Sequence, residues 1–265
     1  MTEGAARSWQ RPSRLRGARA WLLSGLVAAY LVGAAVTIDV DAARIVEGAG
    51  RAADFFGGLL RPDFLTRGVE IRSGLVESLA MTLVSTAIGF TLSIPLGLGA
   101  ARNVVPSPVY SACRALLAVF RAFHPVLVAI VFVAMFGFGA FAGVMTLVVA
   151  TVGFIGKLLA EAVEEIDPAP LEALTVVGAS WPTRIVFAVL PQVMPRILGL
   201  SLYRLDINFR ESAIIGLVGA GGIGATLITA FARYEFESVS AILLLIVAIL
   251  FIGELVSGRI RRGLL

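Results

Sequence analysis

The run from Ala122 to Gly156 contains no Asp, Glu, Lys or Arg, and it constrains the fold more than any other feature of the chain. As one helix it would be roughly 52 Å long, too long for a hydrocarbon core of about 30 Å. The run must therefore break, and the glycine-rich segment Gly137–Gly143 is the expected hairpin. A second charge-free run covers Ser212–Ala232. Both runs predict membrane-spanning helices.

The composition supports the same conclusion. The chain is 58% hydrophobic and 15% charged, against roughly 45–50% and 25% for soluble domains. Too little charge remains to cover a soluble surface, so we expect an integral membrane protein that binds lipid. The net charge of +4 comes mainly from arginines at the ends of apolar runs. We interpret these arginines as topological anchors on the cytoplasmic side and expect no nucleic-acid partner.

The N-terminal part separates into three segments. Residues 1–19 form a basic, cytoplasmic N-terminus with five arginines, and the apolar run 20–38 follows. This pattern also occurs in signal peptides, with Gly33–Ala35 as a cleavage site, but the run is long for a signal core, so we favour a first transmembrane helix. Residues 39–73 are too polar to span. They predict an interfacial or periplasmic linker with an amphipathic helix that ends at Gly57–Gly58.

The core of the chain, residues 74–262, holds the remaining spans. The predicted fold class is an all-α integral membrane protein with six transmembrane helices, both termini in the cytoplasm and the hairpin outside. The linker 39–73 carries five arginines and would lie outside, a partial exception to the positive-inside rule. The later spans are expected within Gly74–Ala101, Val109–Phe136, from the hairpin to Lys157–Glu165, from Val193 through Gly224, and within Ser238–Gly253.

One polar interval, residues 161–191, interrupts the apolar core. Its acidic residues precede Pro168, and a short helix follows that Gly178 ends, since glycine suits a helix C-terminus. Ser180 and Pro182 then begin another helix. The pattern predicts a helix, a turn and a helix across the cytoplasmic face. A docking surface and a long solvated loop are both compatible with it.

The interval also carries a family signature. Its residues resemble the "EAA…G…I…LP" pattern of permease subunits of bacterial ABC importers, with a leucine in place of the third alanine. The resemblance implies a MetI-like type I ABC importer permease fold, in which this cytoplasmic loop couples the spans to a cleft of the ATP-binding subunit. The coupling residues that it implies are Glu172, Ala173, Leu174, Gly178, Ala179, Ile185, Leu190 and Pro191.

Neighbouring segments narrow the resemblance. Gly156–Leu174, Leu190–Pro195 and Leu202–Gly224 are similar to the permease of phosphonate importers. This implies transport of a phosphonate, phosphate or phosphite by alternating access. The implied partners are a secreted or lipid-anchored binding protein, two copies of an ATPase subunit, and a second permease chain in a homo- or heterodimer. The chain lacks a Walker A motif, so we expect no enzyme activity of its own and no cofactor, with ATP and Mg²⁺ bound by the partner ATPase.

A polar cluster at residues 204–211 would be costly if it faced lipid. An internal ion-pair network is one interpretation. The other is a translocation pathway, in which an arginine meets the anionic substrate. The lone histidine has no partner at metal spacing, so we expect no metal site. The pathway candidates are Arg121, His124, Asn208, Arg210 and Ser212.

A glycine segment follows the cluster. Gly219, Gly221, Gly222 and Gly224 have the formal spacing G-x-G-x-x-G, but a dinucleotide site needs a preceding strand and a later acid, and neither is present. Close helix packing and a flexible gate are both compatible with these glycines. The resemblance favours a gate on the outer side of the pathway.

Three other functions remain open. The first is an ABC permease for another solute, such as methionine or glycine betaine. The second is a membrane-embedded enzyme that uses the acidic residues of the polar interval. The third is a channel or a secondary carrier.

Overall fold

The computed structural model describes residues 14–37 and 42–264. The first thirteen residues of the predicted basic N-terminus, the junction of the first span with the linker at 38–41, and residue 265 lie outside the described residues. The chain forms two compact units, Met1–Asp54 and Phe55–Leu265. The described residues form helices and turns without a β-strand.

The first unit contains the helix α1 (Arg14–Thr37) and most of α2 (Ala42–Leu59). The apolar part of α1, Arg19–Thr37, is long and hydrophobic enough to cross a membrane, as the sequence predicted. The helix α2 is amphipathic and carries an exposed ion pair between Glu47 and Arg51 at 3.3 Å. It ends one residue after Gly57–Gly58, so the predicted helix in the linker is present.

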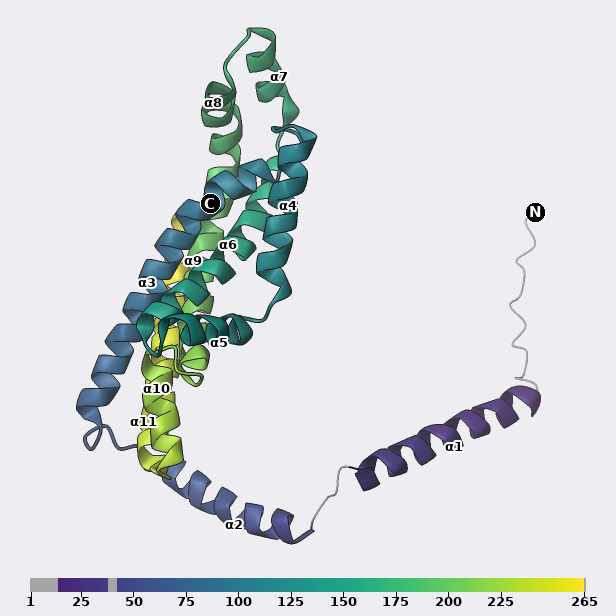
Figure 1. The fold of residues 1–265 in the computed structure, drawn as a ribbon, viewed down its shortest axis with the longest axis vertical. Coiled ribbons are helices and arrows are strands. Elements are labelled where there is room, and N and C mark those ends of the chain that lie inside the picture. Colours follow the sequence, from purple (N-terminus) through teal and green to yellow (C-terminus); the bar gives the residue numbers. More distant parts are fainter. Residues whose placement is uncertain (1–13, 38–41, 265) are drawn as a thin grey trace, which may run out of the picture. The chain divides into compact units, whose positions relative to one another are not determined.

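The second unit is built around α3 (Gly68–Gly99) and α6 (Ala140–Glu164), which have the most extensive contact of any helix pair (Figure 1). Small residues allow this close approach. A Cβ atom on Gly89 would lie 2.6 Å from the Thr151 side chain, and one on Gly97 would lie 2.9 Å from the carbonyl oxygen of Gly156. The helix α3 begins six residues before the predicted span.

The predicted span Val109–Phe136 is not one straight helix. It is divided into α4 (Ser107–Ala122) and α5 (Pro125–Phe136), which meet at 90°. The cause is Pro125, because proline disfavours helical geometry in the preceding residue. His124 is accordingly extended, with φ −65° and ψ 139°. Figure 1 shows α5 lying across the unit, where it contacts α6 and the later helix α9 (Leu190–Gly216).

At one end of the unit the polar interval projects as a hairpin (Figure 1). It contains α7 (Pro168–Val176), α8 (Trp181–Arg184) and a π-helix, η1 (Ile185–Val189). The second helix of the hairpin, which begins at Trp181, does not stay on the cytoplasmic face as predicted. Residues 181–216 form one continuous helix that includes α9, so the predicted fifth span begins at Trp181 rather than near Val193.

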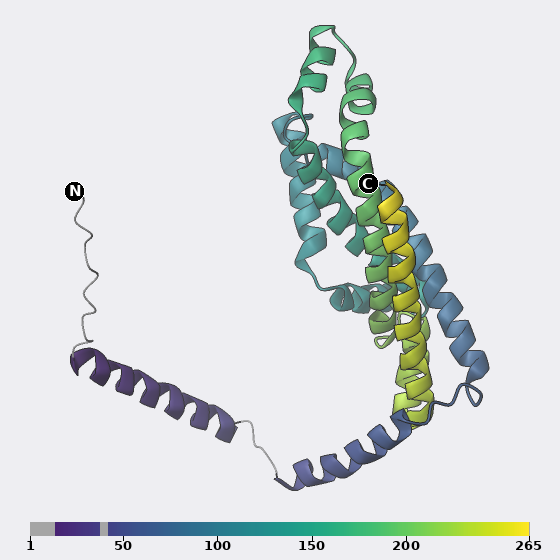
Figure 2. The same ribbon diagram turned by 180° about the vertical axis from the view of Figure 1, so that it is seen from behind.

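At the opposite end the predicted fifth span is interrupted. The helix α9 ends at Gly216, and a turn leads to a short helix, α10 (Ile223–Ala232). A second turn leads to α11 (Phe236–Leu264), which packs beside α9 (Figure 2). The prediction of one helix through Gly216–Gly224 was therefore wrong. The glycines leave the helical conformation and redirect the chain.

An ion pair closes this opposite end. Arg67, which precedes α3, is only 7% exposed and donates to the carboxylate of Glu235 in the turn before α11. Its Nη2 atom lies 3.1 Å from Glu235 Oε1. This hydrogen bond and the positive charge hold the pKa of Glu235 below its ordinary value. The pair fastens the start of α3 to the α10–α11 turn.

Five helices of the described residues are long and apolar enough to cross a membrane, and α4 with α5 makes a sixth if the bent pair counts as one span. The prediction of an all-α, multi-spanning membrane protein is therefore confirmed. The acidic residues of the polar interval lie at the end that carries α7, beyond the apolar part of α6.

Candidate functional site

The short helix α7 is formed by local interactions and packs little against the rest of the chain. The carboxylate of Asp167 caps it by accepting a hydrogen bond from the Ala169 amide at 3.0 Å, with Pro168 in the first turn. No residue of α7 is buried. Val176 is 87% exposed, and Val177, at its end, is 76% exposed. An apolar tip beyond the membrane-spanning region is typical of a surface that a partner covers.

Gly178 ends α7 with two characteristic hydrogen bonds. Its amide donates to the Thr175 carbonyl at 3.0 Å, and the Ala179 amide donates to the Leu174 carbonyl at 2.9 Å. This is the Schellman arrangement, which needs a left-handed residue, and Gly178 has φ +72°. A Cβ atom at Gly178 would meet nothing within 4 Å. Within this chain the glycine is thus required by conformation, and a steric need during docking stays a prediction.

The eight predicted coupling residues separate by exposure. Ile185 is 5% exposed and packs with Leu159 and Val163 of α6, so it supports the hairpin from inside. Those that a partner can reach directly are Glu172, Ala173, Gly178 and Pro191, whereas Leu174, Ala179 and Leu190 are half-buried.

A hollow of about 590 Å³ opens between α7, α8 and the linker that precedes α4. Glu172 lines one side of it and Arg184 the other. The indole Nε1 of Trp181 donates to the Val104 carbonyl at 2.8 Å and fixes the linker to α8. This hollow lies next to the exposed face of α7, so one partner could cover both.

Three acidic residues of the polar interval are held in ion pairs. Glu161 pairs with Lys157 within α6 at 3.1 Å. Glu164 pairs with Arg114 of α4 at 3.0 Å, and Glu165 pairs with Arg196 of α9 at 2.6 Å. The last two pairs tie the end of α6 to α4 and α9. Groups so engaged are structural anchors, and the arrangement does not favour acid–base chemistry at this place.

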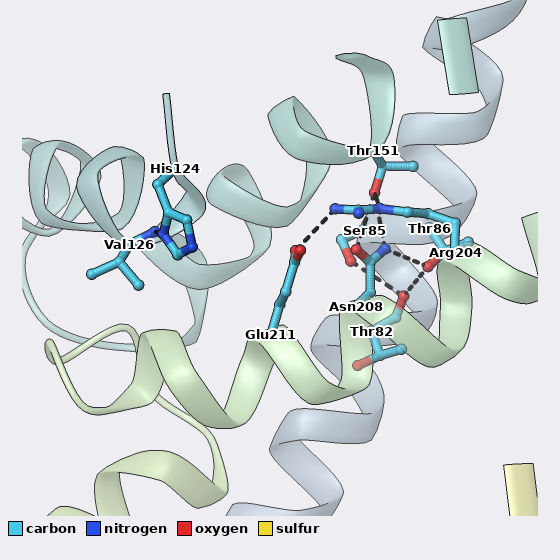
Figure 3. A network of polar contacts seen from close by, with 9 residues as sticks. All are labelled: Thr82, Ser85, Thr86, His124, Val126, Thr151, Arg204, Asn208 and Glu211. Carbon is cyan, nitrogen blue, oxygen red and sulfur yellow. Dashed lines mark hydrogen bonds and ion pairs between the residues drawn. The ribbon is translucent and has the colours of Figure 1, made fainter. Parts of the chain in front are cut away.

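A second polar region lies inside the helix bundle (Figure 3). Asn208 of α9 is fully buried, and its Nδ2 atom donates to Thr86 Oγ1 at 2.8 Å and to Thr151 Oγ1 at 2.9 Å. These threonines belong to α3 and α6. One amide therefore joins three helices, and each bond removes a polar group that would otherwise be unsatisfied in an apolar setting.

Arg204 extends this network toward the surface. Its Nη2 atom lies 2.9 Å from Glu211 Oε2, and its Nε atom donates to Thr151 Oγ1 at 3.3 Å. The guanidinium carbon lies 5.4 Å from the centre of the Phe154 ring, within cation–π range. Asp206 and Arg210, four residues apart in the predicted polar cluster, pair at 3.3 Å as their spacing indicated. Glu211 belongs to the same cluster, but its pairing with Arg204 was not predicted. The available signal was a separation of seven residues, two helical turns.

The pathway candidates are not equally accessible. Arg121, His124 and Arg210 are exposed. Asn208 is buried as described, and Ser212, also fully buried, donates to the Phe209 carbonyl at 2.7 Å. His124 Nδ1 accepts from the Val126 amide at 3.3 Å and caps α5. The role of these residues in transport stays a prediction.

Three of the four candidate gate glycines form the turn between α9 and α10, and Gly224 lies in the first turn of α10. Gly219, Gly221 and Gly222 have positive φ values, from 73° to 91°. A Cβ atom on Gly222 would lie 2.4 Å from Ser78 Oγ, which itself accepts from the Ile223 amide at 2.9 Å. A Cβ atom on Gly224 would lie 2.0 Å from the Ala213 carbonyl oxygen. Close packing is thus present in this structure, and opening as a gate stays a prediction.

One known family matches most of the core of the chain. The family described as "Binding-protein-dependent transport system inner membrane component" matches residues 93–264, from the end of α3 to the end of α11. The chain belongs to this family. The matched range of this permease includes α7 and the α9 side of the polar network, and it confirms the resemblance found in the coupling segment.

Two relatives of the permease share much of its sequence. The phosphate-import permease protein PhnE of Mycolicibacterium smegmatis is 40% identical over 258 residues, which cover 97% of this chain and 48% of the relative. The chain thus spans about half the length of that relative. The phosphite transport system permease protein PtxC of Stutzerimonas stutzeri is 39% identical over 224 residues, with 84% of this chain and 81% of the relative covered.

The fold also has a solved counterpart. In an inward-facing structure of the MetNI methionine ABC transporter, one chain resembles this permease with a TM-score of 0.66 and 26% identity. The similarity covers 74% of this chain and 96% of that one. It confirms the predicted MetI-like fold.

Among the described residues, no group of three or more His, Cys, Asp or Glu side chains could hold a metal ion.

Proposed function

We propose that this permease is the membrane subunit of an ATP-driven ABC importer for phosphonate, phosphate or phosphite. The observation that carries the proposal is the exposed helix α7, ended by Gly178 and joined by one turn to the continuous helix 181–216. Such a helix offers a partner a surface at one end and leads directly into the spans. The chain itself supplies no ATPase motif.

The proposed partners supply the ATP hydrolysis and substrate delivery that we do not expect from this chain. Two copies of an ATP-binding subunit bind α7 and the adjoining hollow, and their closure moves the hairpin. A secreted or lipid-anchored binding protein delivers the substrate from outside, and a second permease chain completes the pathway. Both termini and the α7 hairpin lie in the cytoplasm in this account, so that ATP-driven closure takes place on the inner side.

The connection between α7 and α9 is suited to transmit movement. In η1 the amide of Leu190 bonds to the carbonyl of Ile185, five residues earlier, and Pro191 and Pro195 lie in the following helix. A π-turn and nearby prolines lower local helix rigidity. The buried side of η1 remains packed in the core, with Val189 fully buried. Closure of the ATPase then changes the inclination of α9 without separating it from α6.

The substrate class rests on two arguments. The two relatives are named for phosphate and phosphite, which are both small tetrahedral oxyanions. The exposed pathway candidates Arg121, His124 and Arg210 carry or can carry positive charge, which suits such an anion. A zwitterionic amino acid such as methionine would also need an apolar subsite and a partner for its ammonium group.

Uptake by cells tests the proposal. The gene is deleted from its host, and accumulation of labelled phosphate, phosphite and a phosphonate is measured with and without a plasmid copy. We expect the copy to restore uptake of at least one of these anions, and ATP depletion to abolish that uptake. Labelled methionine is measured in parallel, and restored uptake of methionine alone would contradict the proposed substrate class. Restored uptake that continues without ATP would contradict the mechanism.

A further inference from the structure

Arg204 and Glu211 form an ion pair of unequal accessibility. The Arg204 side chain is 6% exposed, whereas that of Glu211 is 22% exposed. The guanidinium is held from behind by Thr151 and Phe154 of α6. Glu211 therefore covers the accessible side of an arginine that is already oriented. A carboxylate in this position has the charge and the paired oxygens of the anions that arginine binds best.

His124 offers a second position for the Glu211 carboxylate. It lies at the bend between α4 and α5, on the same side of α9 as Glu211 (Figure 3). The Nδ1 atom of His124 accepts the hydrogen bond that caps α5, so the neutral ring carries its proton on Nε2. That N–H group is free of the cap and suited to donate to a carboxylate.

We propose that Glu211 occupies the anion position on Arg204 at rest, and that an incoming tetrahedral oxyanion takes this position when Glu211 moves to His124. Arg204 is then the cation that binds the substrate inside the permease, and Glu211 limits how long it stays. The inference rests on the proposed function and deepens it, because it names the residues that contact the anion in the pathway.

The geometry favours Arg204 over the predicted candidate Arg210. Arg210 is 60% exposed and bonded to Asp206, which lies close to α11, so little holds its guanidinium in one orientation. Thr151 and Phe154 still hold the Arg204 guanidinium after Glu211 leaves, and a fixed planar fork binds an oxyanion with less entropic cost. Competition from Glu211 then prevents the pathway from trapping its substrate, since conduction requires binding that is weak enough to release.

The test measures anion binding to the permease alone. The full chain is reconstituted in lipid nanodiscs, and equilibrium binding of labelled inorganic phosphate is compared between wild type and Glu211→Gln. The glutamine keeps the size and a hydrogen bond to Arg204 but not the negative charge. We expect phosphate to bind about tenfold more tightly, and uptake by cells to fall because release is slower.

Two matched variants identify the arginine. Asp206→Asn neutralises the other carboxylate of α9 and releases Arg210, while Glu47→Gln releases the exposed Arg51 of α2. We expect neither to tighten phosphate binding. A gain with Asp206→Asn instead of Glu211→Gln would overturn the inference in favour of Arg210. An equal gain in phosphate affinity in all three variants would show that only the net charge matters, and it would also overturn the inference.

A variant of the alternative partner tests the movement of Glu211. His124→Asn keeps an acceptor for the cap of α5 but lacks a donor at the Nε2 position. We expect severalfold slower uptake with an unchanged thermal midpoint, because Glu211 then stays on Arg204. This variant also decides the matter if Glu211→Gln does not fold.

The outcomes separate the two proposals. Suppose that wild type imports phosphate, phosphite or a phosphonate. Normal transport by His124→Asn would then show that the inference is wrong and leave the proposed function intact. The same holds if Glu211→Gln folds and binds phosphate no more tightly than wild type. If wild type imports none of these anions, the proposed function itself fails.

Discussion

The α7 hairpin and the polar network of α9 are both polar interruptions of an apolar chain, yet they are built in opposite ways. In α7 nothing is buried, and the defining bonds are made by the backbone around Gly178. In the network, Asn208 and Arg204 are buried, and their bonds join side chains of α3, α6 and α9. The first region is left exposed at the surface, whereas the second is satisfied inside the chain.

This difference predicts different consequences of mutation. A change in α7 should affect transport while leaving the permease stable, because the helix contributes little to the core. A change in the network should affect stability first, because its removal leaves buried polar groups without partners.

The largest effect is expected at Gly178. Gly178→Arg should abolish uptake by cells, because a left-handed arginine is strained and its side chain projects into the docking surface. The amount of permease in the membrane should not change. Gly178→Asn provides the control, since asparagine tolerates the left-handed conformation. Normal uptake by the arginine variant would remove the reason to treat α7 as a coupling helix.

The next effect concerns Asn208. Asn208→Ala should lower stability by about 1–3 kcal/mol, because Thr86 and Thr151 lose a buried partner. Thermal unfolding in detergent measures it. Thr91→Ala serves as the control, since Thr91 is exposed on α3 and bonds only to its own helix. Equal midpoints for the two variants would show that the network contributes no stability.

A smaller effect is expected at the apolar tip of α7. Val176→Ser should weaken binding of the ATPase subunit about tenfold, from the loss of a buried valine side chain at the interface. The thermal midpoint of the permease alone should be unchanged. Binding is measured in nanodiscs against Val186→Ser, a matched change at an exposed valine of η1. The same loss in both variants would argue against a specific contact at the tip.

The smallest effect concerns pH and the pair of Arg67 with Glu235. Because the folded state lowers the pKa of Glu235, the pair stabilises the protein above the unfolded pKa of about 4.3 and loses this contribution as the pH falls through the folded value. Wild type should unfold at a higher temperature than Glu235→Gln at pH 7. The difference should disappear in strong acid. A difference in unfolding temperature that persists in strong acid would show that its cause is not the charge of the Glu235 carboxylate.

The sequence predicted the parts of the fold that depend on neighbouring residues. Long apolar runs identified most of the spans, although the charge-free run 212–232 contains a turn and the short helix α10. Gly178 was recognised because a helix end is determined by a few consecutive residues. The right-angled bend at His124 was not predicted. A proline before an apolar run indicates a break, but the new direction of α5 depends on its packing against α6 and α9.

The polar network shows the same limit at the candidate site. Residues 204–211 were recognised as too polar to face lipid, but their partners on other helices could not be identified. Thr86 and Thr151 are far from α9 in the sequence, and threonines within apolar runs give no distinct signal. Arg210 was chosen as the pathway candidate although Arg204 looks the same in the sequence. Only the structure distinguishes the two, because the Arg204 side chain is buried against α6 and that of Arg210 is exposed.

Reconstitution of the complete importer tests whether transport by this permease depends on ATP and on its proposed partners. The permease is placed in liposomes with its ATPase subunit, and the binding protein is added outside with labelled phosphate, phosphite or phosphonate. We predict accumulation of at least one of these anions that requires ATP inside, the ATPase and the binding protein together. Equal accumulation when the ATPase is omitted would contradict the account, because the chain would then transport its substrate without a partner at α7.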